Sequence, residues 1–270
     1  MSERTTEELR THWDAFAALF EARFERATLQ LAHSLLANLA LERASDLLEV
    51  GGGAGGAARF ARLFLPEGAR HVVTDLAPAM VARIQARSPE VEAREADAEA
   101  LPFGDGSFTR AIANLCYMLV PDADRALAEA ARVLAPGGRL GFSVWGRPEH
   151  SPLFTLPPQA AEAAGVELPP VTRSNFHLGA RPELLARVRA AGLRPLRAWY
   201  QPAVLPVEDG ADFAAAVFQN PTWQGLAATL PPEQLARAQA ELARLADGLL
   251  ADQTPIALEG LLVIAERPAR

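Results

Sequence analysis

Apolar and polar positions change their spacing along this chain, and each change of spacing predicts an element of structure. In residues 5–40, apolar side chains recur at helical spacing between Arg and Glu, which predicts one or two helices. From residue 46 onward, short apolar runs alternate with helical stretches. The predicted strands are 46–50, 70–74, 91–95, 109–115 and 138–145, and the predicted helices are 56–65, 77–87 and 122–135. Strands that alternate with helices are typical of a parallel sheet covered by helices.

The second half of the chain predicts two further strands and more helix. Residues 146–180 are rich in proline, so we expect a long loop with one helical turn. A helix at 181–191 and strands at 194–201 and 256–266 continue the α/β pattern. Residues 208–250 are expected to be helical throughout. A helical insertion between the last two strands predicts a lid.

Composition limits the class of protein. The chain has 270 residues, of which 50% are hydrophobic, and can bury one large core. Its net charge of −7 argues against phosphate backbones and anionic membranes as partners, and no apolar run approaches the roughly 20 residues that span a bilayer. The charged N-terminus lacks the apolar core of a signal peptide. We expect a cytoplasmic monomer or homodimer without nucleic-acid or membrane partners.

Three residue types exclude further chemistry. All 26 basic residues are arginine, so a Schiff-base lysine and a phosphate-binding P-loop lysine are excluded. Cys116 is the only cysteine, which argues against disulfides and thiolate metal sites, and we expect it to be a small buried residue. Four histidines show no metal-ligand spacing and are expected at the surface, so no metal site is predicted. They are His12, His33, His71 and His150.

The run Leu47–Gly56 predicts a cofactor loop. It is an apolar strand, followed by a glycine loop and the start of a helix. Gly51, Gly53 and Gly55 lack the β-carbons that would hold a ligand away, and the helix presents free N–H groups to the same space. Gly51, Gly53 and Gly56 also satisfy G-x-G-x-x-G, so this loop alone leaves a nicotinamide-dependent oxidoreductase open.

Asp75 ends the second predicted strand, where a carboxylate can accept both hydroxyl hydrogens of a ribose. A nucleoside and a dinucleotide would both satisfy it, but residues 95–108 (EADAEALPFGDGSF) discriminate between them. This segment closely resembles the third-strand block of class I S-adenosylmethionine-dependent methyltransferases, in the branch that contains quinone-biosynthesis and secondary-metabolite enzymes. Glu49-x-Gly51-x-Gly53-x-Gly55 then resembles the first motif of that family, and residues 134–140 (LAPGGRL) resemble its turn into the fifth strand.

The resemblance implies a fold and a cofactor. We expect an α/β, Rossmann-like fold with seven strands, mainly parallel, the last strand antiparallel, and S-adenosylmethionine as the cofactor. The chain would be a single domain. Its parts would be an N-terminal helical cap (1–44), a cofactor-binding half (45–145), a substrate loop (146–180) and a helical lid insertion (203–254).

The resemblance also implies roles for individual residues around the glycine loop, whose glycines would approach the methionine part of the cofactor. Glu49 would hold the cofactor ammonium group through a charge-assisted hydrogen bond. Asp75 would bind the ribose hydroxyls, with Leu76 packed on the adenine face. Asp97 would accept a hydrogen bond from the adenine amino group, while the Ala98 N–H would donate to the ring.

The expected reaction is transfer of a methyl group to oxygen or nitrogen of a small apolar or aromatic molecule, including a carboxylate or a phenolate. Many relatives carry a His-His pair where this chain has Met118-Leu119, so the obvious imidazole base is missing. Direct displacement then depends mainly on alignment of the acceptor. Candidate catalytic residues are Asn114, Tyr117 and His177, with His12 as a further base. Asn114 would also line the cofactor site, although a structural amide is an equal alternative.

The acceptor is expected between the strand ends and the lid insertion. Candidate contacts, for which simple packing is the alternative, are Trp13, Tyr117, Phe176, Phe213, Phe218 and Trp223. Arg147 or Arg173 would orient an acceptor that carries a carboxylate. Two other functions stay open: an NAD(P)-dependent oxidoreductase, which leaves residues 95–108 unexplained, and a non-catalytic protein that binds S-adenosylmethionine.

Overall fold

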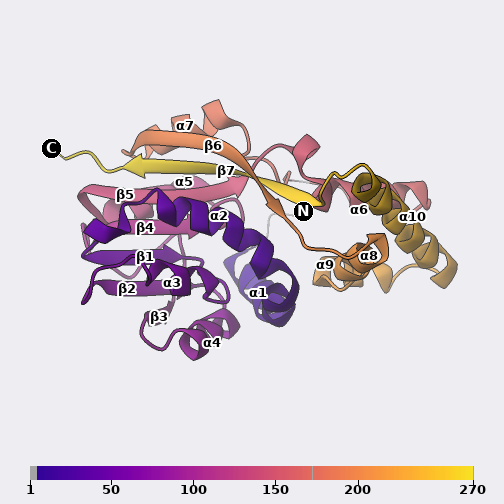
Figure 1. The fold of residues 1–270 in the computed structure, drawn as a ribbon, viewed down its shortest axis with the longest axis horizontal. Helices are drawn as coiled ribbons and strands as arrows, with labels where there is room; N and C mark the ends of the chain where they lie inside the picture. Colours follow the sequence, from indigo (N-terminus) through magenta and orange to yellow (C-terminus); the bar gives the residue numbers. More distant parts are fainter. Residues whose placement is uncertain (1–4, 172, 270) are drawn as a thin grey trace.

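A single seven-stranded sheet organises the molecule, in the order β3-β2-β1-β4-β5-β7-β6 (Figure 1). The structure, a computed structural model, describes residues 5–171 and 173–269. The strands are β1 Asp46–Val50, β2 Arg70–Asp75, β3 Glu92–Glu95, β4 Phe108–Asn114, β5 Leu134–Trp145, β6 Arg194–Val204 and β7 Ala257–Glu266. The first five pair in parallel, and β7 is antiparallel to both β5 and β6. The predicted fold is therefore confirmed.

Helices cover both faces of the sheet. The α-helices are α1 Thr6–Leu19, α2 Glu25–Ala37, α3 Gly56–Ala61, α4 Pro78–Arg87, α5 Ala123–Val133, α6 Pro152–Ala163, α7 Arg181–Ala190, α8 Gly210–Phe218, α9 Pro221–Ala227 and α10 Pro232–Ala251. A π-helical turn, η1 (Phe20–Phe24), joins α1 to α2, and two short 3₁₀ turns are η2 (Leu41–Arg43) and η3 (Pro148–His150).

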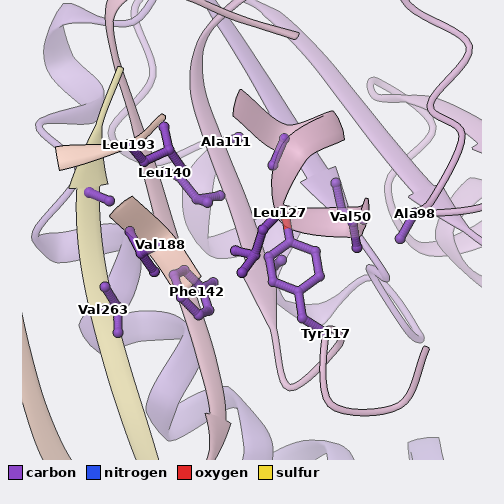
Figure 2. Close-up of a cluster of buried hydrophobic side chains, with 14 of the residues drawn as sticks. Val50, Ala98, Ala111, Tyr117, Leu127, Leu140, Phe142, Val188, Leu193 and Val263 are labelled. Carbon is purple, nitrogen blue, oxygen red and sulfur yellow. The ribbon is translucent and has the colours of Figure 1, made fainter. Parts of the chain in front are cut away.

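Alternate side chains of the central strands divide the core into two layers. Ile112 of β4 and Leu262 of β7 pack with α2 and α3 on one face. Ala111 and Phe142 pack with α5 and α7 on the other face, where Figure 2 shows the buried side chains that fill this layer. Because helices cover both faces of the sheet, apolar residues stand at consecutive positions in these strands, such as Leu47-Leu48 in β1 and Ala111-Ile112-Ala113 in β4.

The α5–β5 connection forms largely as its sequence predicts. Asp122 caps α5, because its carboxylate accepts a hydrogen bond from the Arg125 N–H over 3.0 Å. The chain passes directly into β5 at Leu134, and Gly137 adopts a φ of +77°, a conformation that favours glycine. The pairing of β5 with β4 is irregular between Phe108 and Arg110. The predicted turn at residues 136–138 therefore forms an irregularity within the first residues of β5.

Two sequence predictions about the second half are wrong. The segment expected to be a long loop contains α6, a helix of 12 residues with Pro157 and Pro158 inside it. Burial of Leu156 and Ala160 in the core that α6 shares with α10 offsets the backbone hydrogen bonds that these prolines cannot donate. Residues 208–250 form three helices rather than one continuous stretch, because Pro221 and Pro232 each start a new helix.

The helices α6, α8, α9 and α10 gather beyond one end of the sheet, at the right of the view in Figure 1. They have a core of their own, in which Phe213 and Leu242 are fully buried. The parallel strands point toward this group of helices, so their carboxyl ends face it (Figure 1). Among the helices in the described part of the chain, none is long and apolar enough to cross a membrane.

Candidate cofactor and acceptor site

The glycine loop turns tightly between β1 and α3. Gly51, Gly53 and Gly55 have φ values of +67°, +58° and +85°, which L side chains rarely adopt. The Gly53 N–H donates to Oδ2 of Asp75 over 2.9 Å, and the Ala77 N–H donates to Oδ1 over 3.0 Å. Asp75, a half-buried residue, therefore ties the glycine loop to the start of α4.

Asp75 carries the most informative titration of the site. Burial raises its pKa to about 6, although hydrogen bonds from Ala77 and Gly53 oppose this shift. The negative charge of Asp14 on α1 adds a small further increase in the pKa. A ligand that donates hydrogen bonds to the Asp75 carboxylate would stabilise its ionised form and so lower its pKa again.

The ends of β2, β3 and β4 converge on Cys116. A β-carbon added at Gly51 would lie 2.8 Å from the Cys116 Sγ, so the loop after β4 touches the glycine loop. Burial raises the pKa of the Cys116 thiol to about 12, and the charges of Asp75 and Asp97 add to the shift. The sequence predicted a small buried residue, whereas Cys116 is half-buried and packs against the edge of the core beside the glycine loop. Asp75 pairs with Glu95 in the sheet, and the Ala96 N–H donates to the Asp75 carbonyl over 3.0 Å, so Asp75 and Asp97 follow neighbouring strand ends.

The turn after β3 is shaped by Asp97. Its Oδ1 accepts a hydrogen bond from the Glu99 N–H over 2.8 Å, which fixes the backbone on either side of Ala98. Ala98 is buried in the same core layer as Val50 (Figure 2). Leu76, between Asp75 and Ala77, is half-buried.

Glu49 and His71 form a buried pair that the sequence did not reveal. The His71 Nε2 and Glu49 Oε1 atoms are 2.7 Å apart, and both side chains are almost completely buried. The expectation that His71 lies at the surface is wrong, because its side chain points into the sheet–helix interface beside β1. One Glu49 oxygen is therefore already engaged by a side chain of the protein.

Asn114 bridges two elements at the end of β4. Its Nδ2 donates to the Thr28 carbonyl of α2 over 3.1 Å, and its Oδ1 accepts from the Ser143 hydroxyl over 2.7 Å. The next residue, Leu115, has a φ of +52°, and its N–H donates to the Ser143 Oγ over 2.9 Å. A strained leucine at the carboxyl end of a central strand marks the expected position of the site. Both ends of the Asn114 amide have structural partners.

The N-terminal helices close over the glycine loop. A β-carbon at Gly53 would lie 3.1 Å from the Phe20 ring, and Trp13 packs edge-to-face on Phe20 with a centroid separation of 5.8 Å. Asp14 on α1 accepts a hydrogen bond from the Ala79 N–H over 2.8 Å, which caps α4. Trp13 packs beside Ala77 and thus on the Asp75 side of the loop. The ring contacts of Trp13 are with His12, Phe16 and Phe20 of the N-terminal helices.

Two of the predicted acceptor contacts lie inside cores instead. Tyr117 is 1% exposed, and Figure 2 shows its ring among Val50, Leu127 and Phe142. Burial raises its pKa well above the usual value, and its hydroxyl has no hydrogen-bond partner in the described part of the chain. Phe213 is fully buried between the insertion helices. Neither side chain is placed to contact a substrate.

The remaining predicted rings separate into two groups. Phe218 and Trp223 pack on each other with centroids 5.8 Å apart, against the core of the insertion. Phe176 instead joins Trp145 at the end of β5 and Phe154 of α6. The Trp145 and Phe154 centroids are 4.6 Å apart, and all three rings are half-buried. The sequence missed Trp145 and Phe154, although Trp145 ends a predicted strand, where ligands of open sheets bind.

The predicted orienting cations both have protein partners. Arg147 makes two hydrogen bonds of 2.8 Å to Glu259 and lies over the Tyr200 ring, 4.4 Å from its centroid. Burial opposes ionisation of Glu259, but the hydrogen bonds from Arg147 outweigh it and lower the Glu259 pKa. Arg173 donates to the carbonyl of Val120 over 3.1 Å, and to its neighbour as well.

His177 follows Phe176 and is half-buried. Its Nδ1 lies 3.0 Å from the Ser174 carbonyl, which can only accept, so Nδ1 carries the proton and the neutral ring presents its lone pair at Nε2. Burial lowers the His177 pKa, so the ring is neutral near pH 7.

Comparison with known proteins places the glycine loop and the acidic strand ends in one family. Residues 48–142 match the family model described as a methyltransferase domain. The demethylmenaquinone methyltransferase of Thermus thermophilus is 43% identical over 108 residues, which cover 38% of this chain and 49% of that protein. The malonyl-[acyl-carrier protein] O-methyltransferase of Halorhodospira halophila is 35% identical over 145 residues, or 51% of this chain and 48% of that protein. The matches thus span about half the length of these relatives.

A solved structure extends the likeness of fold to nearly the whole chain. The [4+2]-cyclase SpnF superimposes with a TM-score of 0.60 at 20% identity, covering 98% of this chain and 97% of that one. That protein is named as a cyclase, so the fold by itself does not define the reaction. The match over residues 48–142 is more specific, because it includes the glycine loop, Asp75 and Asp97. This part of the chain therefore belongs to the class I methyltransferase family, whose cofactor is S-adenosylmethionine.

Proposed function

We propose that this protein transfers a methyl group from S-adenosylmethionine to a small, uncharged, aromatic or apolar acceptor. The observation that carries the proposal is that the glycine loop and two acidic strand ends meet: the Gly53 N–H donates to Asp75, and Asp75 lies beside the strand end that leads to Asp97. Two carboxylates at neighbouring strand ends suit a ligand that offers ribose hydroxyls and an adenine amino group. The groups present therefore fit the cofactor of the family.

Individual residues would hold the cofactor as follows. Asp75 would accept from the ribose hydroxyls, Asp97 from the adenine amino group, and the loop Gly51–Gly55 would lie against the methionine part. When bound, S-adenosylmethionine supplies an electrophilic methyl group on a sulfonium. Glu49 would act on the ammonium group only through the oxygen that His71 leaves free, so its effect is that of a nearby buried charge.

We infer that the acceptor binds on the aromatic cluster of Trp145, Phe154 and Phe176. These rings lie at the carboxyl end of β5, next to the end of β4 where Asn114 and Ser143 meet. Arg147 is neutralised by Glu259, which disfavours recognition of an acceptor carboxylate there. Half-buried rings with few polar groups favour a flat, uncharged acceptor.

Alignment would supply most of the catalysis. The aromatic cluster would orient the acceptor, and the helical cap and the insertion would exclude water. His177 follows Phe176 of this cluster in the chain, and the Nε2 atom of its neutral ring is the candidate base. A phenol would need modest help from such a base, whereas a free amine would need none.

A nicotinamide-dependent oxidoreductase fits the loop less well. In dinucleotide-binding loops the pyrophosphate lies against N–H groups at the helix N-terminus. Here the Gly56 N–H donates to the Glu25 carboxylate over 3.0 Å, which places a protein anion at that position. A protein that only binds the cofactor would show the same loop, so turnover is the decisive observation.

The test combines binding with turnover. Calorimetry should detect binding of S-adenosylhomocysteine and none of NAD. Asp75→Ala should weaken S-adenosylhomocysteine binding by about 1.5–3 kcal/mol, the contribution of hydrogen bonds to a charged group. Release of S-adenosylhomocysteine should follow addition of 1-naphthol or 1-naphthylamine, with benzoate as the charged control. NAD binding would refute the cofactor assignment, and cofactor binding without release with any of the probes would favour a binding-only protein.

A further inference from the structure

An ion pair outside the recognised motifs, between buried Glu25 and half-buried Arg87, holds the glycine loop on the side of α2 and α4. Glu25, the first residue of α2, is 6% exposed. Its Oε1 accepts a hydrogen bond from the Gly56 N–H over 3.0 Å, and its Oε2 accepts from Arg87 Nη1 over 2.7 Å. Arg87 ends α4, and the same Nη1 donates to the Ala54 carbonyl over 2.8 Å. The pair is thus hydrogen-bonded to the loop on both sides of Gly55, at Ala54 and at Gly56.

Residues 54–56 have little space in which to change conformation. Gly55 has a φ of +85°, and a β-carbon there would lie 3.2 Å from the Ile84 Cα of α4. A β-carbon at Gly56 would lie 2.8 Å from the Glu25 carboxylate. Three elements, α2, α3 and α4, therefore meet at this turn with almost no space between them. A change in the charge or length of Glu25 must be taken up by the loop.

The same helix also reaches the other side of the site. Thr28, one turn after Glu25 on α2, accepts the hydrogen bond from Asn114 at the end of β4. A shift of α2 would therefore move the glycine loop and the end of β4 together. Because a buried carboxylate is costly without partners, the Gly56 N–H and Arg87 are needed to keep Glu25 in place.

From these contacts we propose that Glu25 and Arg87 are positioning residues that set the glycine loop for cofactor binding. They touch the loop backbone from the side of α2 and α4 and act on the cofactor only through the loop. The inference rests on the proposed function, since it concerns the affinity of the same site for S-adenosylmethionine.

The chain offers a matched control one turn earlier. Glu21 in η1 pairs with Arg83 over 3.0 Å and lies 3.5 Å from Arg87, so it joins the turn before α2 to the same helix, α4. Among the residues that the structure describes, the ion-pair partners of Glu21 are these two arginines of α4, and none lies in the glycine loop. Glu21→Gln removes an ion pair between the N-terminal helices and α4. Glu25→Gln removes such a pair as well, and it also weakens the hydrogen bond that the Gly56 N–H donates.

The experiment measures S-adenosylhomocysteine affinity by calorimetry, together with thermal stability and kcat with 1-naphthol at saturating cofactor. Glu25→Gln is nearly isosteric and should fold. It should raise the Kd about tenfold, or about 1.4 kcal/mol, and leave kcat within about twofold. Arg87→Gln should behave alike, and the double variant should lose less than the sum of both. Glu21→Gln should leave the Kd within about twofold.

Equal changes in Kd for Glu25→Gln and Glu21→Gln would overturn the proposal. So would a loss of thermal stability in Glu25→Gln with unaltered affinity at a temperature where the variant is folded, which is the result of a purely structural role. Wild-type protein that fails to bind S-adenosylhomocysteine would refute the proposed function instead. The two failures are therefore distinguishable.

Discussion

The Nε2 atom of His71 lies 2.7 Å from Oε1 of Glu49, and burial leaves both side chains almost inaccessible to water. Glu49 lies on β1 two residues before the glycine loop, and His71 lies near the start of β2, beside it in the sheet. Burying a carboxylate without a hydrogen-bond donor costs free energy, and His71 supplies such a donor to Glu49. The geometry of the first cofactor motif thus depends on a residue outside that motif.

We expect His71→Leu to destabilise the protein by about 1–3 kcal/mol, because it leaves a buried acceptor without its partner. His71→Gln, which keeps an N–H donor, should lose less. The free energy of unfolding in urea measures both. His33→Leu is the control, since His33 is half-buried and stacks on Phe60, with centroids 3.9 Å apart, without a carboxylate partner. A His71→Leu variant as stable as His33→Leu would show that Glu49 does not rely on the imidazole.

Asp75 should make cofactor binding depend on pH. Because burial raises its pKa to about 6, the carboxyl becomes protonated in the folded protein as pH falls below that value. A neutral carboxyl is a poorer acceptor for two ribose hydroxyls. The affinity for S-adenosylhomocysteine should therefore fall between pH 7.5 and about 5, as measured by calorimetry, and Asp75→Asn should bind weakly at both ends of this range. A flat profile in the wild-type protein would contradict the role of Asp75.

The stability of the free protein should show the opposite trend. The Asp75 pKa is higher in the folded state, at about 6, than its ordinary value of 3.8, so the folded state binds more protons between these two values. The contribution of Asp75 to stability is therefore present at low pH and is lost as pH rises through about 6. Comparing wild-type and Asp75→Asn unfolding at pH 4.5 and about 7 isolates this contribution, and a difference of the reverse sign would refute the raised pKa.

The regular elements could be predicted because their signals are local. Strand β1 occupies residues 46–50 as predicted, since an apolar run between polar turns needs no distant partner to be recognised. The helix α6 could not be, because its prolines dominate the local signal while its stability comes from the core shared with α10. The spacing of apolar residues predicts whether a segment is a helix or a strand. Burial against a helix that is distant in the sequence leaves no local pattern.

The cofactor residues were easier to predict than the acceptor residues for a similar reason. The glycines, Asp75 and Asp97 follow directly from strand ends, whereas Tyr117 was expected on the floor of the site by the same rule. Tyr117 lies an even number of residues beyond Ala111 and Ala113, and its ring packs in the same core layer as these two residues of β4 instead of facing the site. The partner of Glu49 was invisible because His71 has no local feature that separates a buried imidazole from a surface one.

We expect no side chain to be an indispensable general base. His177→Gln and His12→Gln should each retain kcat within about threefold on the true acceptor, since direct displacement depends mainly on alignment. The pH profile of kcat distinguishes a required histidine base from its absence. With such a base, kcat decreases when the pH falls below the pKa of the histidine, and burial lowers that pKa for His177. A loss of about 10²-fold in kcat for either variant would show that a histidine performs this step.

The acceptor should bind to the rings at the end of β5 and not to those of the insertion. Trp145 and Phe154 are half-buried beside the carboxyl ends of the central strands, while Phe218 and Trp223 pack on the core of the insertion. We therefore expect Trp145→Ala and Phe154→Ala to raise the KM for 1-naphthol by about tenfold or more, the loss of an aromatic contact of about 0.5–1.5 kcal/mol together with its buried area. Affinity for S-adenosylhomocysteine should stay nearly unchanged. Phe218→Ala is the matched control, because it removes a ring of similar exposure from the insertion and should lower stability with little effect on KM. If Phe218→Ala raises the KM and Trp145→Ala does not, the acceptor lies against the insertion helices instead.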